Sequence, residues 1–446
     1  MRRRVATVIV GALLVGFAAG LVQPVTGAAR AATDEDYRLM RLFTEVLAEV
    51  QQKYVEKKTT KELIIQAIKG MVSSLDPHSA YLTPEEYKEL QIETKGSFSG
   101  VGIEITMRDG VLTVVAPIEG TPAYNAGIQA GDKIIKIDGK LTKGMSLMEA
   151  VKAIRGPKGT KVTLTIMREG LKQLKDFTIV RDIIPIHSVR YYLLDDGYGY
   201  VRITNFQENT SSDLAKAIEV LTSQPTPLKG LVLDLRNDPG GLLSEAVRVA
   251  DQFLSHGVIV STRGRLPTQQ MVFKATPDTT VPDCPVIVLV NQGSASASEI
   301  VAAALQDNKR ALVVGMPTFG KGSVQSIIPL GANGALRLTT ARYYTPNGRQ
   351  IQAKGITPDI IVPFRPPPKT KPKASESAVV REKDLKGAIP PAPEAKNKPK
   401  KHNNSKLYYP KDKLSRDNQL TRALELLKAW EVFAPLARAS AQAGAK

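Results

Sequence analysis

The chain contains a single cysteine, Cys284, among its 446 residues. One thiol cannot form an intramolecular disulfide, so the fold must be stabilised by buried apolar surface. Histidine is almost as scarce. Its four residues are scattered, and none has a metal-ligand spacing such as His-Glu-x-x-His. The sequence therefore predicts no metal site and no other bound cofactor.

Aromatic residues make up only 5% of the chain and are dispersed, which argues against a base-stacking surface for nucleic acids. The net charge is nevertheless +18, and much of it lies between Arg365 and Lys413, where proline, lysine and alanine dominate. Such a composition is typical of disordered segments. We expect a solvated linker at 364–415, with contact to an anionic envelope surface as the alternative.

A long apolar run begins at Val5, directly after three consecutive arginines, and small residues follow it near Ala29. These features are typical of an export signal. Roughly 18 apolar residues are also enough to span a bilayer, so residues 1–32 are predicted to be a signal peptide or a membrane anchor. We expect an exported protein, periplasmic or otherwise extracytoplasmic. If the segment is not cleaved, it would anchor the protein to the inner membrane.

The remaining sequence divides by the period of its apolar residues. Helical spacing dominates 33–95, and short alternating strands follow in 96–182. Strand and helix patterns alternate through 183–363, which favours a largely parallel sheet covered by helices. A final amphipathic helix is expected in 416–446. Docking on the core and pairing with a partner both remain open for it.

One strand pattern runs into the small residues of Gly293-Ser294-Ala295-Ser296-Ala-Ser298 and then into a helix start. This arrangement lifts a side chain out of the carboxyl edge of a sheet. The helix dipole and free backbone N–H groups can stabilise an oxyanion there. One of these serines is therefore a candidate nucleophile. The alternative is structural, because Ser296 and Glu299 also fit a capping box.

A lone lysine, Lys321, lies between two glycines in an otherwise apolar neighbourhood. In an extended segment residues two apart share a face, so Lys321, Ser323 and Gln325 would project together. Lysine acts as a general base only if burial lowers its pKa from about 10.4 towards neutrality, and an amide such as Gln325 can orient the amine without adding charge. The alternative is a surface lysine in a glycine-rich turn.

The motif Asp234-Leu-Arg236-Asn-Asp-Pro-Gly240-Gly241 again joins a strand to a helix through glycines. Paired glycines allow backbone N–H groups to approach a reacting carbonyl closely. Asp234 and Arg236 are interpreted as a structural ion pair. Glu299 and Asp307 are likewise assigned structural roles.

These three motifs, together with Asp76-Pro-His-Ser-Ala-Tyr81, resemble in their order the motifs of the carboxyl-terminal processing (tail-specific) proteases, over roughly residues 34–363. The resemblance implies a serine endopeptidase with a Ser-Lys dyad. It selects the middle serine as nucleophile, a lysine base 25 residues further on and an amide that orients it: Ser296, Lys321 and Gln325. It also implies an oxyanion site made of backbone N–H groups from Gly240 or Gly241 and from Ala297.

The same resemblance implies an α/β protease core with a mostly parallel sheet, an inserted β-rich PDZ domain at 96–182 and a helical N-terminal region. Successive N–H groups of the PDZ carboxylate-binding loop would capture a chain terminus, and the strand beyond would add the peptide as an extra strand. The residues in the place of this loop are Ser99, Gly100, Val101, Gly102 and Ile103. Arg155 is a candidate for coupling peptide binding to the core, with a surface cation as the alternative.

The expected partners are protein or peptide substrates with exposed C-termini. An adaptor, a homo-oligomer and membrane association through the N-terminus are compatible with this reading, whereas nucleic acid is not expected. A non-catalytic peptide-binding scaffold on the same fold is the rival hypothesis, and the intact dyad argues against it. A Ser-His-Asp protease is a further alternative and would need a catalytic histidine. Neither His187 nor His256 has a supporting motif. Activity retained in His78→Ala would exclude His78 as well.

Overall fold

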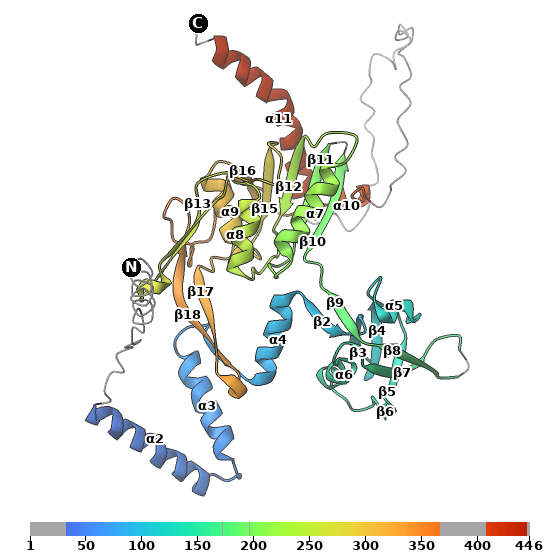
Figure 1. Cartoon of the computed structure of the whole chain (residues 1–446), viewed down its shortest axis with the longest axis vertical. Coiled ribbons are helices and arrows are strands. Elements are labelled where there is room, and N and C mark those ends of the chain that lie inside the picture. Colours follow the sequence, from blue (N-terminus) through green and yellow to red (C-terminus); the bar gives the residue numbers. More distant parts are fainter. Residues whose placement is uncertain (1–32, 172, 196, 366–406, 444–446) are drawn as a thin grey trace, which may run out of the picture. The chain divides into compact units, whose positions relative to one another are not determined.

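The computed structural model describes residues 33–171, 173–195, 197–365 and 407–443 (Figure 1). The predicted export signal and most of the predicted linker lie outside these ranges. One compact unit ends at Ser74 and a second begins at Leu75. Among the described residues, no helix is both long and apolar enough to cross a membrane.

The first unit contains the helices α2 (Asp34–Lys53) and α3 (Thr60–Ser73). Each begins at a threonine, Thr33 or Thr59, whose side chain accepts a backbone N–H while a carboxylate three residues later binds the threonine N–H. No residue of α2 is buried, although the helix is amphipathic. The prediction of a helical N-terminal region is confirmed.

The second unit begins with the short strand β1 (Ala80–Leu82) and the helix α4 (Pro84–Lys95). Thr83 caps α4 and Pro84 occupies its first turn. Gly96 ends the helix with a φ of 65°, in the left-handed region that glycine adopts without strain. The chain then enters β2 (Ser97–Gly100), which pairs with β9 (Asp182–Pro185) at the exit of the β-rich module.

This β-rich module is an antiparallel sheet in the order β3-β4-β5-β7-β8, with β6 paired to β5. Its strands are β3 (Ile103–Arg108), β4 (Val111–Pro117), β5 (Lys133–Ile137), β6 (Lys140–Leu141), β7 (Lys161–Met167) and β8 (Lys175–Val180). The helices α5 (Pro122–Asn125) and α6 (Leu147–Ile154) complete it. A separate hydrophobic core lies inside the module. In this sheet β3 is an edge strand, so one side of it has no strand partner among the described residues.

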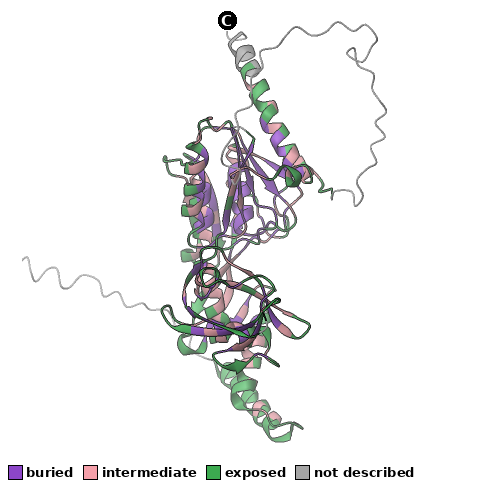
Figure 2. Cartoon of the chain, turned by 90° about the vertical axis from the view of Figure 1, so that its right-hand side faces the viewer, coloured by how far each residue is buried: buried purple, intermediate pink, exposed green. Residues whose placement is uncertain are grey.

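The larger core is built on a six-stranded mixed sheet in the order β10-β11-β12-β15-β16-β19. Its strands are β10 (Val189–Asp195), β11 (Tyr198–Ile203), β12 (Gly230–Asp234), β15 (Val286–Val290), β16 (Ala311–Gly315) and β19 (Ile360–Ile361). All neighbours pair in parallel except β10 with β11. Short runs of buried valine, isoleucine and leucine form the central strands, as expected for strands covered on both faces (Figure 2).

Helices cover both faces of this mixed sheet. Residues of α7 (Thr210–Thr222), α8 (Leu243–Asp251) and α9 (Ala297–Asp307) share one hydrophobic cluster with the strands (Figure 1). Residues of α11 (Asn418–Ala443) share a second cluster with the other face. In chain order β12 is followed by α8, and β15 is followed by α9. The turns at the carboxyl ends of these two strands contain the candidate site residues.

A second, antiparallel sheet adjoins the first. It contains β13 (Val258–Gly264), β14 (Met271–Lys274), β17 (Ser323–Pro329) and β18 (Ala335–Tyr344) together with β1. Between β13 and β14, and between β17 and β18, only short 3₁₀ turns intervene, η1 (Pro267–Gln269) and η2 (Gly331–Asn333), and such short connections produce antiparallel pairs. The expectation of a mostly parallel sheet is therefore not confirmed for the core as a whole, which holds one mixed and one antiparallel sheet.

The C-terminal segment returns to the core. Leu407 and Tyr409 hydrogen-bond to Leu193 of β10, and α10 (Lys411–Leu414) follows directly. The end of the predicted linker is thus structured. The first half of α11 buries Leu420 and Leu427 against the sheet, so docking on the core is the alternative that holds there.

Candidate active site

Ser296 lies at the turn between β15 and α9, as the N-cap residue of the helix, and is 8% exposed. Its backbone has φ 57° and ψ −112°, a conformation that side-chain-bearing residues rarely adopt. Strain of this kind costs about 1–3 kcal/mol and is concentrated at functional sites. The turn therefore resembles the strained strand-to-helix turns that expose a nucleophile.

The two neighbouring serines have structural partners. The hydroxyl of Ser294 donates to the backbone oxygen of Leu235 at 2.8 Å, and that of Ser298 donates to the oxygens of Asp238 and Ala295 at 3.0 and 2.9 Å. Ser296, by contrast, makes no capping hydrogen bond with its side chain. The hydroxyls of Ser294 and Ser298 are thus held by backbone oxygens, whereas no such bond to a backbone oxygen holds the Ser296 hydroxyl within the described residues.

Glu299 joins the serine turn to the lysine turn. Its carboxyl group is fully buried, and one oxygen accepts the N–H groups of Ser296 and Lys321 at 2.8 and 2.9 Å. The other oxygen accepts the Thr318 hydroxyl at 2.5 Å and the Gly320 N–H at 2.7 Å. Glu299 does have the structural role predicted for it. The predicted capping box explains only one of its four hydrogen bonds, and Thr318 was missed because nothing in the sequence pairs it with a glutamate 19 residues earlier.

Lys321 is half-buried at the start of the segment that becomes β17. Burial lowers the pKa of its amine, and the nearby cation of Arg337 lowers it further, while Glu299 acts in the opposite direction. Within the described residues, the Lys321 amine and the Ser296 hydroxyl do not hydrogen-bond to each other. The environment therefore shifts the equilibrium of the Lys321 amine towards its neutral form.

Gln325 lies two residues into β17 and is anchored through its amide nitrogen. That nitrogen donates to the hydroxyls of Thr339 at 2.8 Å and Ser323 at 3.1 Å, which confirms that Ser323 and Gln325 share a face. The amide oxygen Oε1 is buried and has no hydrogen-bond partner within the described part of the chain. A buried acceptor without a donor is costly, so this oxygen is suited to receive an N–H from a mobile group nearby.

The motif that begins at Asp76 contacts the strand that holds Gln325 in place. The Asp76 carboxylate accepts the hydroxyl of Ser79 at 2.7 Å, and Ser79 in turn accepts the backbone N–H of Thr339 at 3.1 Å. Burial acts to raise the pKa of Asp76, but hydrogen bonds from Ser79 and His78 outweigh it and hold the pKa low. Burial and the neighbouring Lys321 lower the pKa of His78. The motif thus lies next to the lysine, a position that the sequence did not reveal.

Gly240 presses against the serine turn. A Cβ added to Gly240 would lie 2.8 Å from Ser296 Cβ and 2.9 Å from the Ala297 nitrogen, and φ is +99°. Only glycine fits this position. The Gly240 N–H donates to Asp238 Oδ1 at 2.8 Å, whereas the N–H groups of Gly241 and Ala297 have no acceptor within the described residues.

Asp234 and Arg236 form the ion pair that the sequence predicted, with contacts of 2.7 to 3.0 Å. The same guanidinium also binds Asp417 and Gln419 at the start of α11, and Tyr200 donates to Asp234 at 2.8 Å. This buried network attaches the C-terminal helix to the end of β12. Its partners in α11 lie 181 and 183 residues further along the chain, which no local pattern could indicate.

The predicted carboxylate-binding loop is only partly a loop. Ser99 and Gly100 lie in β2 and pair with β9, Val101 and Gly102 form the connection, and Ile103 begins the edge strand β3. Gly102 has φ +82°, and an added Cβ would lie 2.3 Å from the Thr121 side chain. The Ser99 hydroxyl is buried without a partner among the described residues.

Arg155 is not a free surface cation. It ends α6, and its guanidinium binds both carboxylate oxygens of Glu89 in α4 at 2.8 and 2.7 Å while lying 5.0 Å from the centre of the Phe98 ring. It therefore links the β-rich module to the helix that precedes it.

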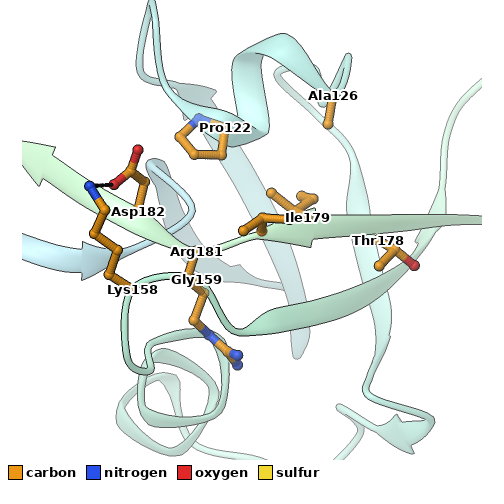
Figure 3. A pocket seen from close by; sticks show the side chains of 9 residues that line it. Pro122, Ala126, Lys158, Gly159, Thr178, Ile179, Arg181 and Asp182 are labelled. Atoms are coloured by element: carbon orange, nitrogen blue, oxygen red, sulfur yellow. Dashed lines mark ion pairs between the residues drawn. The ribbon is translucent and has the colours of Figure 1, made fainter.

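A hollow of about 360 Å³ lies elsewhere on the module (Figure 3). Pro122 and Ala126 of the α5 region face Ile179 of β8 across it, and Lys158 and Asp182 form an ion pair of 2.7 Å at its rim. None of the predicted loop residues lines it. The hollow nevertheless adjoins the predicted peptide site, because its lining residue Asp182 pairs with Gly100.

Comparison with known proteins gives the family. Residues 197–362 match the model of Peptidase family S41, and residues 113–168 match that of a PDZ domain. The chain is 49% identical over 394 residues to a carboxy-terminal-processing protease of Bartonella bacilliformis, covering 88% of this chain and 89% of the relative. It is 41% identical over 321 residues to a carboxyl-terminal-processing protease of a Synechocystis species, covering 70% and 74%.

Among solved structures, the photosystem II D1 C-terminal processing protease is 32% identical with a TM-score of 0.42, covering 72% of this chain and 92% of that one. The sequence matches decide the assignment, because the similarity to the Bartonella protein extends over most of both chains. The chain belongs to peptidase family S41, as a PDZ-containing carboxyl-terminal processing protease.

Proposed function

We propose that the protein cleaves exported proteins near their C-terminal tails with a Ser-Lys dyad, Ser296 and Lys321. One observation carries this proposal: the buried carboxylate of Glu299 binds the backbone N–H groups of both residues, at 2.8 and 2.9 Å. Residues separated by 25 positions are thereby attached to one anchor. The structural hydrogen bonds of Ser294 and Ser298 further support Ser296 as the nucleophile.

In this mechanism the neutral amine of Lys321 takes the hydroxyl proton of Ser296 as Oγ attacks the scissile carbonyl. The Lys321 ammonium then gives that proton to the leaving amine, and the acyl group stays on Ser296. Water attacks the ester with Lys321 again as the base. Gln325 Oε1, buried and without a donor, would accept an N–H from Lys321 and orient it. The free N–H groups of Gly241 and Ala297 would hold the oxyanion.

Substrate selection would use the PDZ domain, which we place at 96–182, before a protease core at 183–363. The free side of the edge strand β3 can pair with an extended peptide. Val101 and Gly102 lie directly before this strand, where backbone N–H groups can bind a terminal carboxylate. The Arg155–Glu89 contact offers a route from this loop to α4. Export and an extracytoplasmic location are proposed from the composition of residues 1–32 alone.

The test is proteolysis of a model substrate with an unstructured apolar tail. Ser296→Ala and Lys321→Ala should each reduce kcat by at least about 1,000-fold while the tail still binds the PDZ domain. Ser255→Ala and Lys274→Ala serve as matched controls, because both residues are exposed and lie outside the site. Unchanged cleavage by either dyad variant would refute the mechanism. Tail binding without any cleavage by the unmodified protein would favour the scaffold hypothesis.

A further inference from the structure

Asp238 is a buried carboxyl group next to the candidate nucleophile that the mechanism above does not use. It is 0% exposed and lies in the turn between β12 and α8. Its backbone oxygen accepts the Ala295 N–H at 2.9 Å and the Ser298 hydroxyl at 3.0 Å, so it contacts both sides of Ser296. The backbone of Asp238 therefore holds the serine turn on both sides of Ser296.

The side chain of Asp238 decides which glycine N–H can serve the oxyanion. Oδ1 accepts the N–H of Gly240 at 2.8 Å, so that donor is occupied. The Gly240 carbonyl accepts the N–H of Phe206 at 2.9 Å. In a trans peptide the C=O and the following N–H point in opposite directions, so the N–H of Gly241 is directed away from Phe206. Gly241 is therefore the glycine whose N–H is free to bind a reacting carbonyl.

The second carboxyl oxygen of Asp238, Oδ2, is unusual in its lack of a hydrogen-bond partner in the described part of the chain. Oδ2 is buried and has no hydrogen-bond donor within the described residues. A buried negative charge with an unpaired oxygen is strongly disfavoured, whereas protonation of Oδ2 removes the charge and leaves Oδ1 to accept the Gly240 N–H. The charged groups that act on it are Arg202 of β11, which favours the carboxylate, and Asp234 of β12, which opposes it. Neither makes a hydrogen bond to it.

We propose, on the basis of the Ser-Lys mechanism above, that Asp238 is a positioning residue of the oxyanion site that must be uncharged for the site to work. Uncharged, it holds Gly240 against Ser296 and leaves the region neutral. Charged, it would place a negative group beside the developing oxyanion, which like-charge repulsion disfavours.

The pH behaviour follows from this geometry. Burial raises the pKa of Asp238 to about 8. Ionisation of Asp238 should therefore lower kcat near pH 8, as a falling limb of the kcat profile, in the sense opposite to deprotonation of Lys321, which raises kcat. The folded protein also binds this proton more tightly than the unfolded chain, so the contribution to stability is fully present below the unfolded value of 3.8 and is lost as the pH rises through about 8.

The experiment compares kcat and KM from pH 6 to pH 10 for the unmodified enzyme and for Asp238→Asn, which keeps an acceptor for Gly240 but cannot ionise. The unmodified enzyme should lose kcat about tenfold per pH unit above the limb. The variant should show no such limb, with KM unchanged. A peptide boronic acid forms a tetrahedral adduct on a serine. The affinity of the unmodified enzyme for it should fall above pH 8 because of Asp238, and the affinity of Asp238→Asn should lack this fall.

Asp307→Asn is the matched control. Its side chain is 3% exposed and pairs with Arg349 at the opposite end of α9, so the limb should stay in place. If Asp238→Asn does not fold, infrared spectroscopy of the unmodified protein should show a protonated carboxyl band that disappears above pH 8. The same limb in Asp238→Asn, or no such band, would overturn the proposal. Loss of activity in Ser296→Ala tests the dyad separately, since the dyad can be correct while Asp238 has no role.

Discussion

Two turns meet at Ser296, and each is held by a buried carboxyl group, but the two groups differ in how completely they are hydrogen-bonded. Glu299 accepts four hydrogen bonds, two on each oxygen. Asp238 accepts one, and its other oxygen has no donor among the described residues. A saturated carboxylate stabilises one arrangement of the turns it joins. An unsaturated one has an oxygen open to a proton, so the comparison separates a fixed anchor, Glu299, from a carboxyl group with an open oxygen, Asp238.

The largest effect is expected where the fixed anchor is disturbed. Glu299→Gln replaces one acceptor oxygen with an NH₂ group that faces backbone donors, so two buried donors lose their partner. Each unpaired group costs about 1–3 kcal/mol of stability. The Ser296 and Lys321 turns should separate, and kcat/KM should fall by more than about 100-fold. Urea unfolding and proteolysis would measure both.

Glu62→Gln provides the control for this change, because Glu62 closes a similar capping box at α3 on the surface and touches no second turn. It should lower stability slightly and leave kcat unaffected. If Glu299→Gln kept full activity, Glu299 would be only a helix cap, and the contrast with Asp238 would have no functional meaning.

The second largest effect is expected for Gly240→Ala, which disturbs a smaller region in the turn that contains Asp238. The new methyl group would meet Ser296 Cβ at 2.8 Å in a backbone conformation with φ +99°, so the serine or the glycine turn must move. We expect kcat to fall by at least about 100-fold with a modest loss of stability. Gly70→Ala is the control: it lies in α3, no atom lies within 4 Å of the added Cβ, and the change should leave kcat unaltered. Activity close to normal in Gly240→Ala would show that the two turns are not in tight contact.

How far the sequence predicts this site depends on whether each interaction is local. The strand-glycine-helix pattern located the serine turn and the glycine turn, and the family resemblance selected Ser296 within the first. The alternation after Lys321 placed Ser323 and Gln325 on one face, because it depends on neighbouring residues. The bonds from Glu299 to the Lys321 turn join residues 19 to 22 positions apart. The role of Asp238 depends on the burial of one oxygen, which has no local sequence signal.

The fold shows the same division. Alternating strands and helices correctly predicted the stretch around β12, β15 and α9, whose buried faces follow from periodicity. The antiparallel sheet of β13, β14, β17 and β18 was missed, since the pairing of β13 with β18 is set by tertiary contacts about 80 residues apart. Docking of α11 was left open for the same reason: its anchor is Arg236, in another part of the chain.

The smallest effect, and the finest test of the comparison, concerns Arg202. Its guanidinium lies 3.7 Å from Asp234 and is 31% exposed, and it favours the charged form of Asp238. Arg202→Gln removes that cation and leaves Asp234 less compensated, so both changes should raise the pKa of Asp238. The falling limb of kcat should move to higher pH, by less than about one unit because the cation is partly screened by solvent. Arg190→Gln, opposite Arg202 on β10 and exposed, should leave the limb unchanged. A shift of the limb to lower pH in Arg202→Gln would mean that a group other than Asp238 produces it, whereas any effect on the low-pH limb would implicate Lys321 instead.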